Sequence, residues 1–188
     1  DENIAFVVKN LRKDQKARII LGVESQDDQI RMKNLKKIMP KSFIEKVFYI
    51  IGQYCGIVGV EFNIIFQAPE VIGKDAITEG NKTVEYGLDL AEQYNVPIDF
   101  NFHPYYPSTK SLEMFPNHPR AIIEDALEGL IAMKTLINQR KSSAQIFIGW
   151  FDEQHDQQQD QRQEETAKYL DTFDKFNESQ DISFLENH

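Results

Sequence analysis

The chain has 188 residues, 41% of them hydrophobic, which is enough for one domain with a substantial core. Its formal net charge of −9 argues against nucleic acid or an anionic membrane as a partner held by charge alone. Cys55 is the single cysteine, which excludes a disulfide framework and a cysteine-built metal site within one chain. No window is long and apolar enough to span a bilayer, so no membrane partner is expected.

The start of the chain is acidic, Asp1-Glu2, and is unlike the basic leader of a signal peptide. A reducing, cytoplasmic location fits this start and the lone cysteine. The chain lacks an initiator Met and begins inside a predicted helix, residues 3–13. We therefore expect a piece of a longer protein, with a processed start as the alternative.

The predicted elements then alternate between strands and helices. Residues 18–24 form the first strand, 26–39 a short helix and loop, and Ser42 with Glu45 makes a capping-box pattern that predicts the start of the next helix. Further strands are expected over 58–66, 96–103 and 144–150, with helices ending near Asn95, covering 122–131 and including 167–173.

The first strand is a short, continuous apolar run, residues 19–23, which is typical of strands buried on both faces of a parallel sheet. Its repetition along the chain predicts an α/β fold of four βα units with a parallel sheet, a half or partial TIM-type barrel. Residues 1–177 are expected to form this single domain and residues 178–188 a mobile tail.

A partial barrel leaves the edges of its first and last strands open, which invites unwanted pairing. We therefore expect these edges to be covered. The candidates are a missing amino-terminal barrel half, self-association of this chain, a partner subunit or a terminal segment.

Polar side chains follow the first strand where ligands bind in parallel sheets, at the carboxyl end. Glu24 offers a carboxylate that accepts from two hydroxyls or from an ammonium, and Ser25 stands next to it. The alternative is a strand-end acid that caps the following helix.

The third strand runs into a loop with His103, Tyr105 and Tyr106. Their rings could stack on a base and the imidazole could transfer a proton, or the rings could simply seal the barrel mouth. Asn63 and Asn101 lie inside apolar strands, so they either bind ligand or join a buried polar network.

One acid–histidine cluster is present near the carboxyl end of the chain: Asp152, Glu153, His155 and Asp156. Such groups could bind a divalent metal, but the almost wholly polar residues 157–163 that follow favour solvated surface, so no metal site is predicted. Phosphate loops of the G-x-x-x-x-G-K type, G-x-G-x-x-G and G-x-S-x-G are all absent.

The order of several short motifs resembles a known family. Residues 21–25, Leu-Gly-Val-Glu-Ser, resemble the fourth-strand signature of radical S-adenosylmethionine (SAM) enzymes of the Elongator-like, methylthiotransferase-like and archaeosine-synthesis branches. Residues 67–70, Gln-Ala-Pro-Glu, and 107–112, Pro-Ser-Thr-Lys-Ser-Leu, resemble the motifs after the fifth and sixth strands. The match covers residues 1 to about 135 and concerns the second half of the family's barrel.

The resemblance implies roles for particular residues. SAM would contact Glu24, Ser25, Asn63 and Gln67, although Gln67 stands where the family usually has Gly. A small-molecule, nucleoside-like substrate would contact Asn101, His103, Tyr105 and Tyr106.

The family's Cys-x3-Cys-x2-Cys motif is absent, and Cys55 alone cannot hold its four-iron cluster (4Fe-4S). This chain alone is therefore not expected to perform radical chemistry. The first interpretation is the SAM- and substrate-facing wall of a radical SAM-type enzyme whose cluster half lies elsewhere. The second is a cluster-free binding or assembly module derived from that fold, and the third is an unrelated βα-barrel-type enzyme. Three cysteines encoded upstream in frame, or in a neighbouring gene, would favour the first interpretation over the second.

Overall fold

The computed structural model describes residues 2–54, 56–105, 109–119, 121–149 and 160–186. Four strands form one sheet in the order β1-β2-β3-β4, and all neighbouring pairs are parallel. The strands are β1 (Ala17–Glu24), β2 (Val58–Phe66), β3 (Ile98–Pro104) and β4 (Ile146–Ile148). The predicted α/β fold with a parallel sheet is confirmed.

Helices connect and flank these strands. They are α1 (Glu2–Asn10), the π-helix η1 (Gln29–Asn34), α2 (Lys41–Gly52), α3 (Lys74–Tyr94), α4 (Thr109–Met114), α5 (Ile123–Gln139), α6 (Asp160–Ser179) and α7 (Ser183–Glu186). The predicted capping box at Ser42 is wrong, because Pro40 is the N-cap of α2 and no side chain caps it. Proline suits this place, since it needs no amide hydrogen there.

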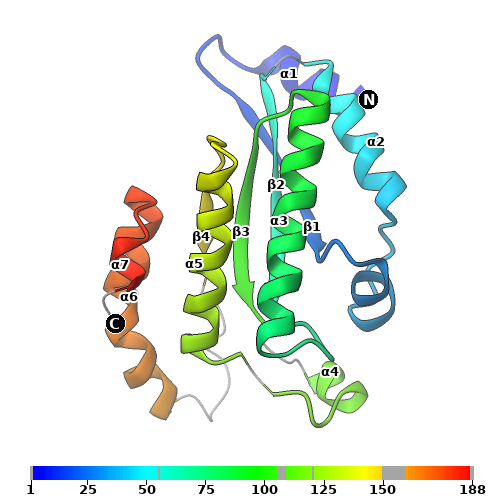
Figure 1. Cartoon of the computed structure of the whole chain (residues 1–188). Helices are drawn as coiled ribbons and strands as arrows, with labels where there is room; N and C mark the ends of the chain where they lie inside the picture. The colour runs from blue at the N-terminus through cyan, green and yellow to red at the C-terminus, as the bar shows by residue number, and fades with distance from the viewer. Residues whose placement is uncertain (1, 55, 106–108, 120, 150–159, 187–188) are drawn as a thin grey trace.

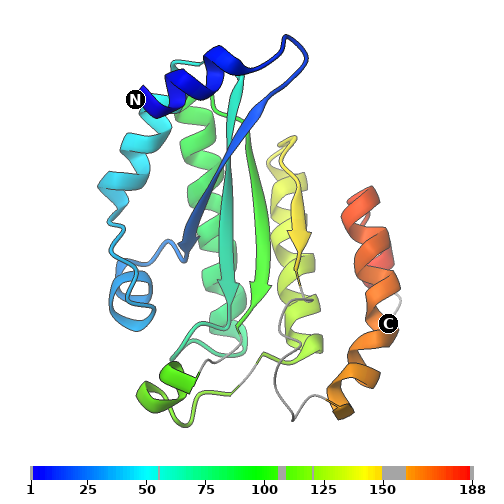
Figure 2. The ribbon, with the colours of Figure 1, turned by 180° about the vertical axis from the view of Figure 1, so that it is seen from behind.

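The described helices cover only one face of the sheet. In Figure 1, α3 and α5 lie in front of the strands and α2 stands beside α3, and Figure 2, seen from behind, shows the strands in front with α1 across their amino ends. Side chains alternate accordingly, so that Phe62, Ile64, Phe100 and Phe102 are buried under the helices. The residues between them, among them Asn63 and Asn101, point to the opposite side of the sheet, which we call the bare face.

Two glycines let the helices approach the aromatic layer closely. A Cβ on Gly87 of α3 would lie 2.8 Å from Cε1 of Phe100, and one on Gly129 of α5 would lie 2.6 Å from Cε2 of Phe66. Neither distance is compatible with a side chain, so both positions require glycine.

Two side-chain amides, one from Asn177 of α6 and one from Gln180 just after it, seal the outer edge of β4. Asn177 accepts from the Ile148 amide at 2.9 Å and donates to its carbonyl at 3.1 Å. Gln180 does the same with Ile146, at 2.9 and 3.0 Å. The two amides thus replace a neighbouring strand, and a terminal segment covers this edge, as one of the expected arrangements requires.

The segment expected to be a mobile tail, residues 178–188, makes specific contacts where the structure describes it. Gln180 bonds to β4, and Leu185 of α7 is 2% exposed in the core. Within the described ranges, no helix combines the length and the apolar character that a membrane crossing requires.

Candidate functional site

The carboxyl end of β1 carries an ion pair between a buried carboxylate and a half-exposed lysine. Glu24 has a positive φ of 64° and is 5% exposed, and its Oε1 accepts from Nζ of Lys37 at 2.6 Å. A Cβ on Gly22 would lie 2.8 Å from that Nζ and 2.9 Å from that Oε1, so the pair occupies the space above this glycine. Since Gly22 belongs to the bare face, so does the ion pair.

Ser25 points the other way, toward α3. Its hydroxyl donates to Oε1 of Glu79 at 2.6 Å and accepts from the amide of Asp27 at 2.9 Å. Glu79 also accepts from the side chain of Gln26 and from the hydroxyl of Thr83. The Ser25 hydroxyl therefore organises the loop after β1, and its only proton is committed to Glu79.

Arg31 anchors the same loop from within. Its side chain is fully buried, its Nη1 donates to the Ser25 carbonyl at 2.5 Å and its Nε to the Met39 carbonyl at 2.6 Å, and Asp28 pairs with its Nη2. A buried guanidinium needs such partners, so these contacts hold the β1–α2 connection in one conformation.

A histidine that the sequence analysis did not select clamps the loop after β2. The Glu70 amide donates to Nδ1 of His118 at 3.2 Å, so Nε2 carries the proton and donates to the Gln67 carbonyl at 2.9 Å. Gln67 and Glu70 both have positive φ, 62° and 70°. The imidazole therefore stabilises a loop whose backbone is locally strained.

Tyr105 joins this clamp. Its ring contacts the ring of His118 edge-on, with centroids 5.3 Å apart, and its amide donates to the Phe66 carbonyl at 2.8 Å. Its hydroxyl is buried and has no partner within the described part of the chain. Tyr105, which was predicted to contact a substrate, is thus a buried side chain beside this loop. This position is in keeping with the alternative in which the rings seal the barrel mouth.

A cavity of about 360 Å³ opens outside this clamp at the carboxyl edge of the sheet. Its lining is mostly apolar: Ile72, Met114, Phe115, Pro116 and Pro119, with Glu70, Asn117 and His118. The cavity lies beside the loop that follows β2, at the end of the sheet where ligands bind in parallel sheets.

The bare face carries the two predicted asparagines side by side. Asn63 of β2 and Asn101 of β3 are register partners, and Asn101 donates from its amide to Glu61 of β2. The amide oxygen of Asn63 is buried and lacks a partner among the described residues. A buried acceptor without a donor is unusual, so this oxygen is available to accept a hydrogen bond from a ligand.

His103 and a salt bridge complete the bare face. The ring of His103 lies on Gly149, since a Cβ there would be 3.0 Å from its Nδ1. Nearer the amino ends, Arg18 of β1 pairs with Asp99 of β3, and Asp99 also accepts from the Gln145 amide at 2.7 Å. Polar groups therefore run along this face from one end of the sheet to the other.

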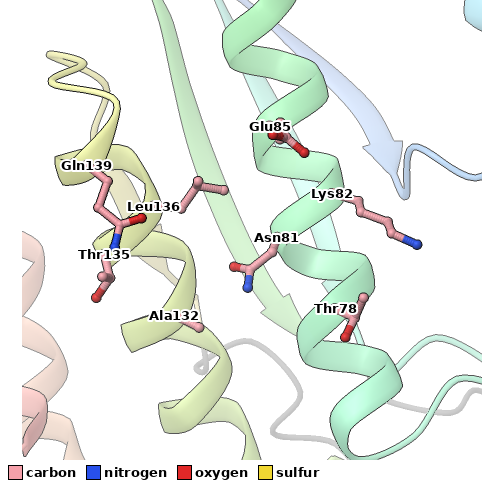
Figure 3. Close-up of a pocket in the computed structure, with 8 residues that line it drawn as sticks. All are labelled: Thr78, Asn81, Lys82, Glu85, Ala132, Thr135, Leu136 and Gln139. Carbon is pink, nitrogen blue, oxygen red and sulfur yellow. The ribbon is translucent and has the colours of Figure 1, made fainter.

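A larger groove of about 480 Å³ lies elsewhere, between α3 and α5 on the outer side of the helical layer. Figure 3 shows Asn81 and Leu136 reaching toward one another across it. The groove is open, and its charged groups, Lys82 and Glu85, stand on α3 alone. We place the candidate site at the carboxyl edge instead, because that edge gathers buried polar groups from three strands.

Some predicted residues fall outside the described ranges: Tyr106 and the cluster Asp152, Glu153, His155 and Asp156. Among described residues, no group of three or more His, Cys, Asp or Glu side chains could hold a metal ion. The sequence analysis missed Lys37, Glu79 and His118, whose partners lie 13, 54 and 51 residues away in the chain.

Comparison of the chain with protein-family models, with curated proteins and with solved structures found no significant match.

Proposed function

We propose that this chain forms the ligand-facing wall of a βα barrel of the radical SAM type, and that it binds a nucleoside-like ligand such as SAM at the carboxyl edge of β1, β2 and β3. The observation that carries the proposal is the bare face. A parallel sheet is normally covered on both faces, or closed on itself around a core. Here the uncovered face bears polar side chains, as a barrel interior with a ligand would.

The donors and acceptors of this face suit a nucleoside with an amino-acid arm. The orphaned amide oxygen of Asn63 can accept from a ribose hydroxyl or an exocyclic amine. Glu24 and Lys37, paired at 2.6 Å above Gly22, offer one charge of each sign. A zwitterionic group is complementary to such a pair because its ammonium meets the carboxylate and its carboxylate meets the ammonium.

The residues do not fit an iron–sulfur cluster. Three thiolates of the family's motif are needed, and the sequence contains one cysteine. The proposal therefore gives this chain the tasks of binding and orienting a ligand, and no step of radical chemistry.

The test uses S-adenosylhomocysteine, the stable analogue, with the purified chain and isothermal calorimetry. Weak binding is expected. Replacing Glu24 with Gln should weaken it by about 1.5–3 kcal/mol, the usual contribution of a hydrogen bond to a charged group. Asn63→Leu should weaken binding as well, because it removes the acceptor.

Glu92→Gln is the matched control, since this glutamate lies near the end of α3 with its side chain 81% exposed. Its affinity should equal that of the unaltered chain, and thermal unfolding of each variant reports whether the fold is kept. Absence of binding, or equal affinity in all variants, would contradict the proposed function.

A second candidate, a cluster-free binding module, is favoured by the single cysteine. Anaerobic reconstitution of the chain with iron and sulfide should yield no stoichiometric cluster absorbance. About four irons per chain would exclude the module and would require ligands other than a three-cysteine motif.

A further inference from the structure

We propose that β1 and the neighbouring side of α2 form a docking surface for an acidic polypeptide segment, which adds a strand to β1 and covers an apolar stripe on α2. The inference rests on the sheet edge and on charge, and it does not depend on the ligand proposed above.

The outer edge of β1 has free backbone groups. The amide of Ala17 donates to the Ile57 carbonyl at 3.0 Å, so Ala17, Ile19 and Leu21 bond to β2, up to the register shift between Leu21 and Glu24. The backbone groups of Arg18 and Ile20 consequently point outward. Within the described part of the chain, no hydrogen bond reaches them.

α2 lacks a neighbour on the same side. Its other flank meets α3, where a Cβ on Gly52 would lie 2.6 Å from the Tyr94 carbonyl oxygen. Phe43, Val47 and Ile50, at positions i, i+4 and i+7, form an apolar stripe on the flank away from this contact. Figure 1 shows α2 as the outermost described helix beside α3, and Phe43 is 48% exposed.

Many exposed apolar side chains belong to the first third of the chain. Eight of the thirteen large hydrophobic side chains that are exposed among the described residues belong to residues 2–57. They are Phe6, Val7, Ile20, Met32, Ile38, Phe43, Tyr49 and Ile57. Two of them, Ile20 of β1 and Phe43 of α2, belong to the proposed docking surface.

Charge identifies the kind of partner. Residues 2–57 contain eleven Lys and Arg against six Asp and Glu, whereas residues 58–188 contain ten against twenty-three. The docking surface therefore belongs to a basic segment of an otherwise acidic chain. An acidic partner is complementary to it.

A second copy fits less well. Two β1 edges related by a two-fold axis run antiparallel, which places Lys13 and Lys16 of one copy beside Lys33 and Lys36 of the other. Like charges would then meet at both ends of the contact. Pairing of β1 with β4 of another copy is blocked, because Asn177 and Gln180 already occupy that edge.

The experiment selects short random-sequence peptides, displayed on phage, for binding to the purified chain. Enriched peptides should be acidic and rich in β-branched residues. A synthetic peptide of that sequence should protect the Ile20 amide from hydrogen exchange, and added salt should weaken its binding. Ile20→Pro, which removes an outward donor, should reduce affinity about tenfold or more, equivalent to about 1.4 kcal/mol.

Ile20→Thr, which keeps the amide hydrogen, should bind within a few-fold of the unaltered chain, and Lys36→Glu should bind more weakly. Failure to enrich any peptide, peptides without acidic excess, or binding indifferent to Ile20→Pro would overturn the proposal. Sedimentation showing a dimer of the chain that Ile20→Pro dissociates would also overturn it and assign the surface to a second copy.

Discussion

The two edge strands of the sheet, β4 and β1, differ in whether their outward backbone groups are hydrogen-bonded. The outward backbone groups of Ile148 and Ile146 on β4 bond to the side-chain amides of Asn177 in α6 and of Gln180 just after it, at distances between 2.9 and 3.1 Å. The outward backbone groups of Arg18 and Ile20 on β1 form no hydrogen bond with a described residue. An edge with unpaired backbone groups is a template for another strand. Another strand can therefore extend the sheet at β1 and not at β4.

The largest effect is expected from opening the sealed edge. Replacing Asn177 and Gln180 together with Leu leaves four backbone groups of β4 without partners. The free energy of unfolding should fall by on the order of 3 kcal/mol or more, since each unmet buried group costs about 1–3 kcal/mol. Urea denaturation measures this change.

Glu178→Leu on the same helix is the control, because Glu178 is exposed and lies between the two amides. It should change the free energy of unfolding by less than about 0.5 kcal/mol. A double variant as stable as this control would show that the amides do not seal β4.

A smaller effect distinguishes the two sides of β1 itself. Ile19→Pro removes an amide that points toward β2, whereas Ile20→Pro removes one that points outward. We expect Ile19→Pro to lower the free energy of unfolding by on the order of 3 kcal/mol and Ile20→Pro by less than about 1 kcal/mol. Equal losses, measured by urea denaturation, would mean that the outward groups of β1 are already bonded.

The smallest effect concerns Lys134 of α5, which lies behind the sealed edge. It is 6% exposed, its Nζ donates to Oε1 of Gln180 at 3.3 Å, and burial lowers its pKa below the ordinary 10.5. The folded chain thus binds this proton more weakly than the unfolded chain. Stability should consequently rise as the pH increases from the lowered pKa toward 10.5.

Lys134→Met should remove that rise, which thermal unfolding across this pH range detects. Titration of Tyr86 changes stability with pH in the opposite direction, in the unaltered chain and in Lys134→Met alike. Burial, with a smaller contribution from Glu45, raises the pKa of Tyr86 to about 12, so stability should fall between pH 10 and about 12. An unchanged pH profile in Lys134→Met would show that Lys134 does not carry the effect.

The sequence predicts the order of elements well where a single local pattern decides it. β2 has the predicted bounds, 58–66, because its apolar residues alternate from Val58 to Ile64 and Gly56 stands two residues before it. The parallel sheet follows from such runs separated by helical patterns. The predicted start of α2 is wrong because the capping pattern of Ser42 and Glu45 begins two residues after Pro40, which is already the N-cap of the helix.

The sequence predicts which site residues stand at strand ends, but not which residues distant in the chain become their partners. The placement of Glu24 at a strand end follows from the run before it, but its partner Lys37 does not, because the loop between them must fold back over Gly22. Likewise, Asn177 and Gln180 stand in a polar stretch that resembles solvated surface. Their role depends on α6 lying beside β4, which no local pattern contains.

The most direct test of the account is hydrogen exchange of individual amides in the isolated chain, followed by NMR. We predict that the outward amides of Arg18 and Ile20 exchange rapidly, while those of Ile146 and Ile148 are protected by Asn177 and Gln180. Equal protection at both edges, or faster exchange at β4 than at β1, would contradict the central claim that the sheet is closed on one side and open on the other.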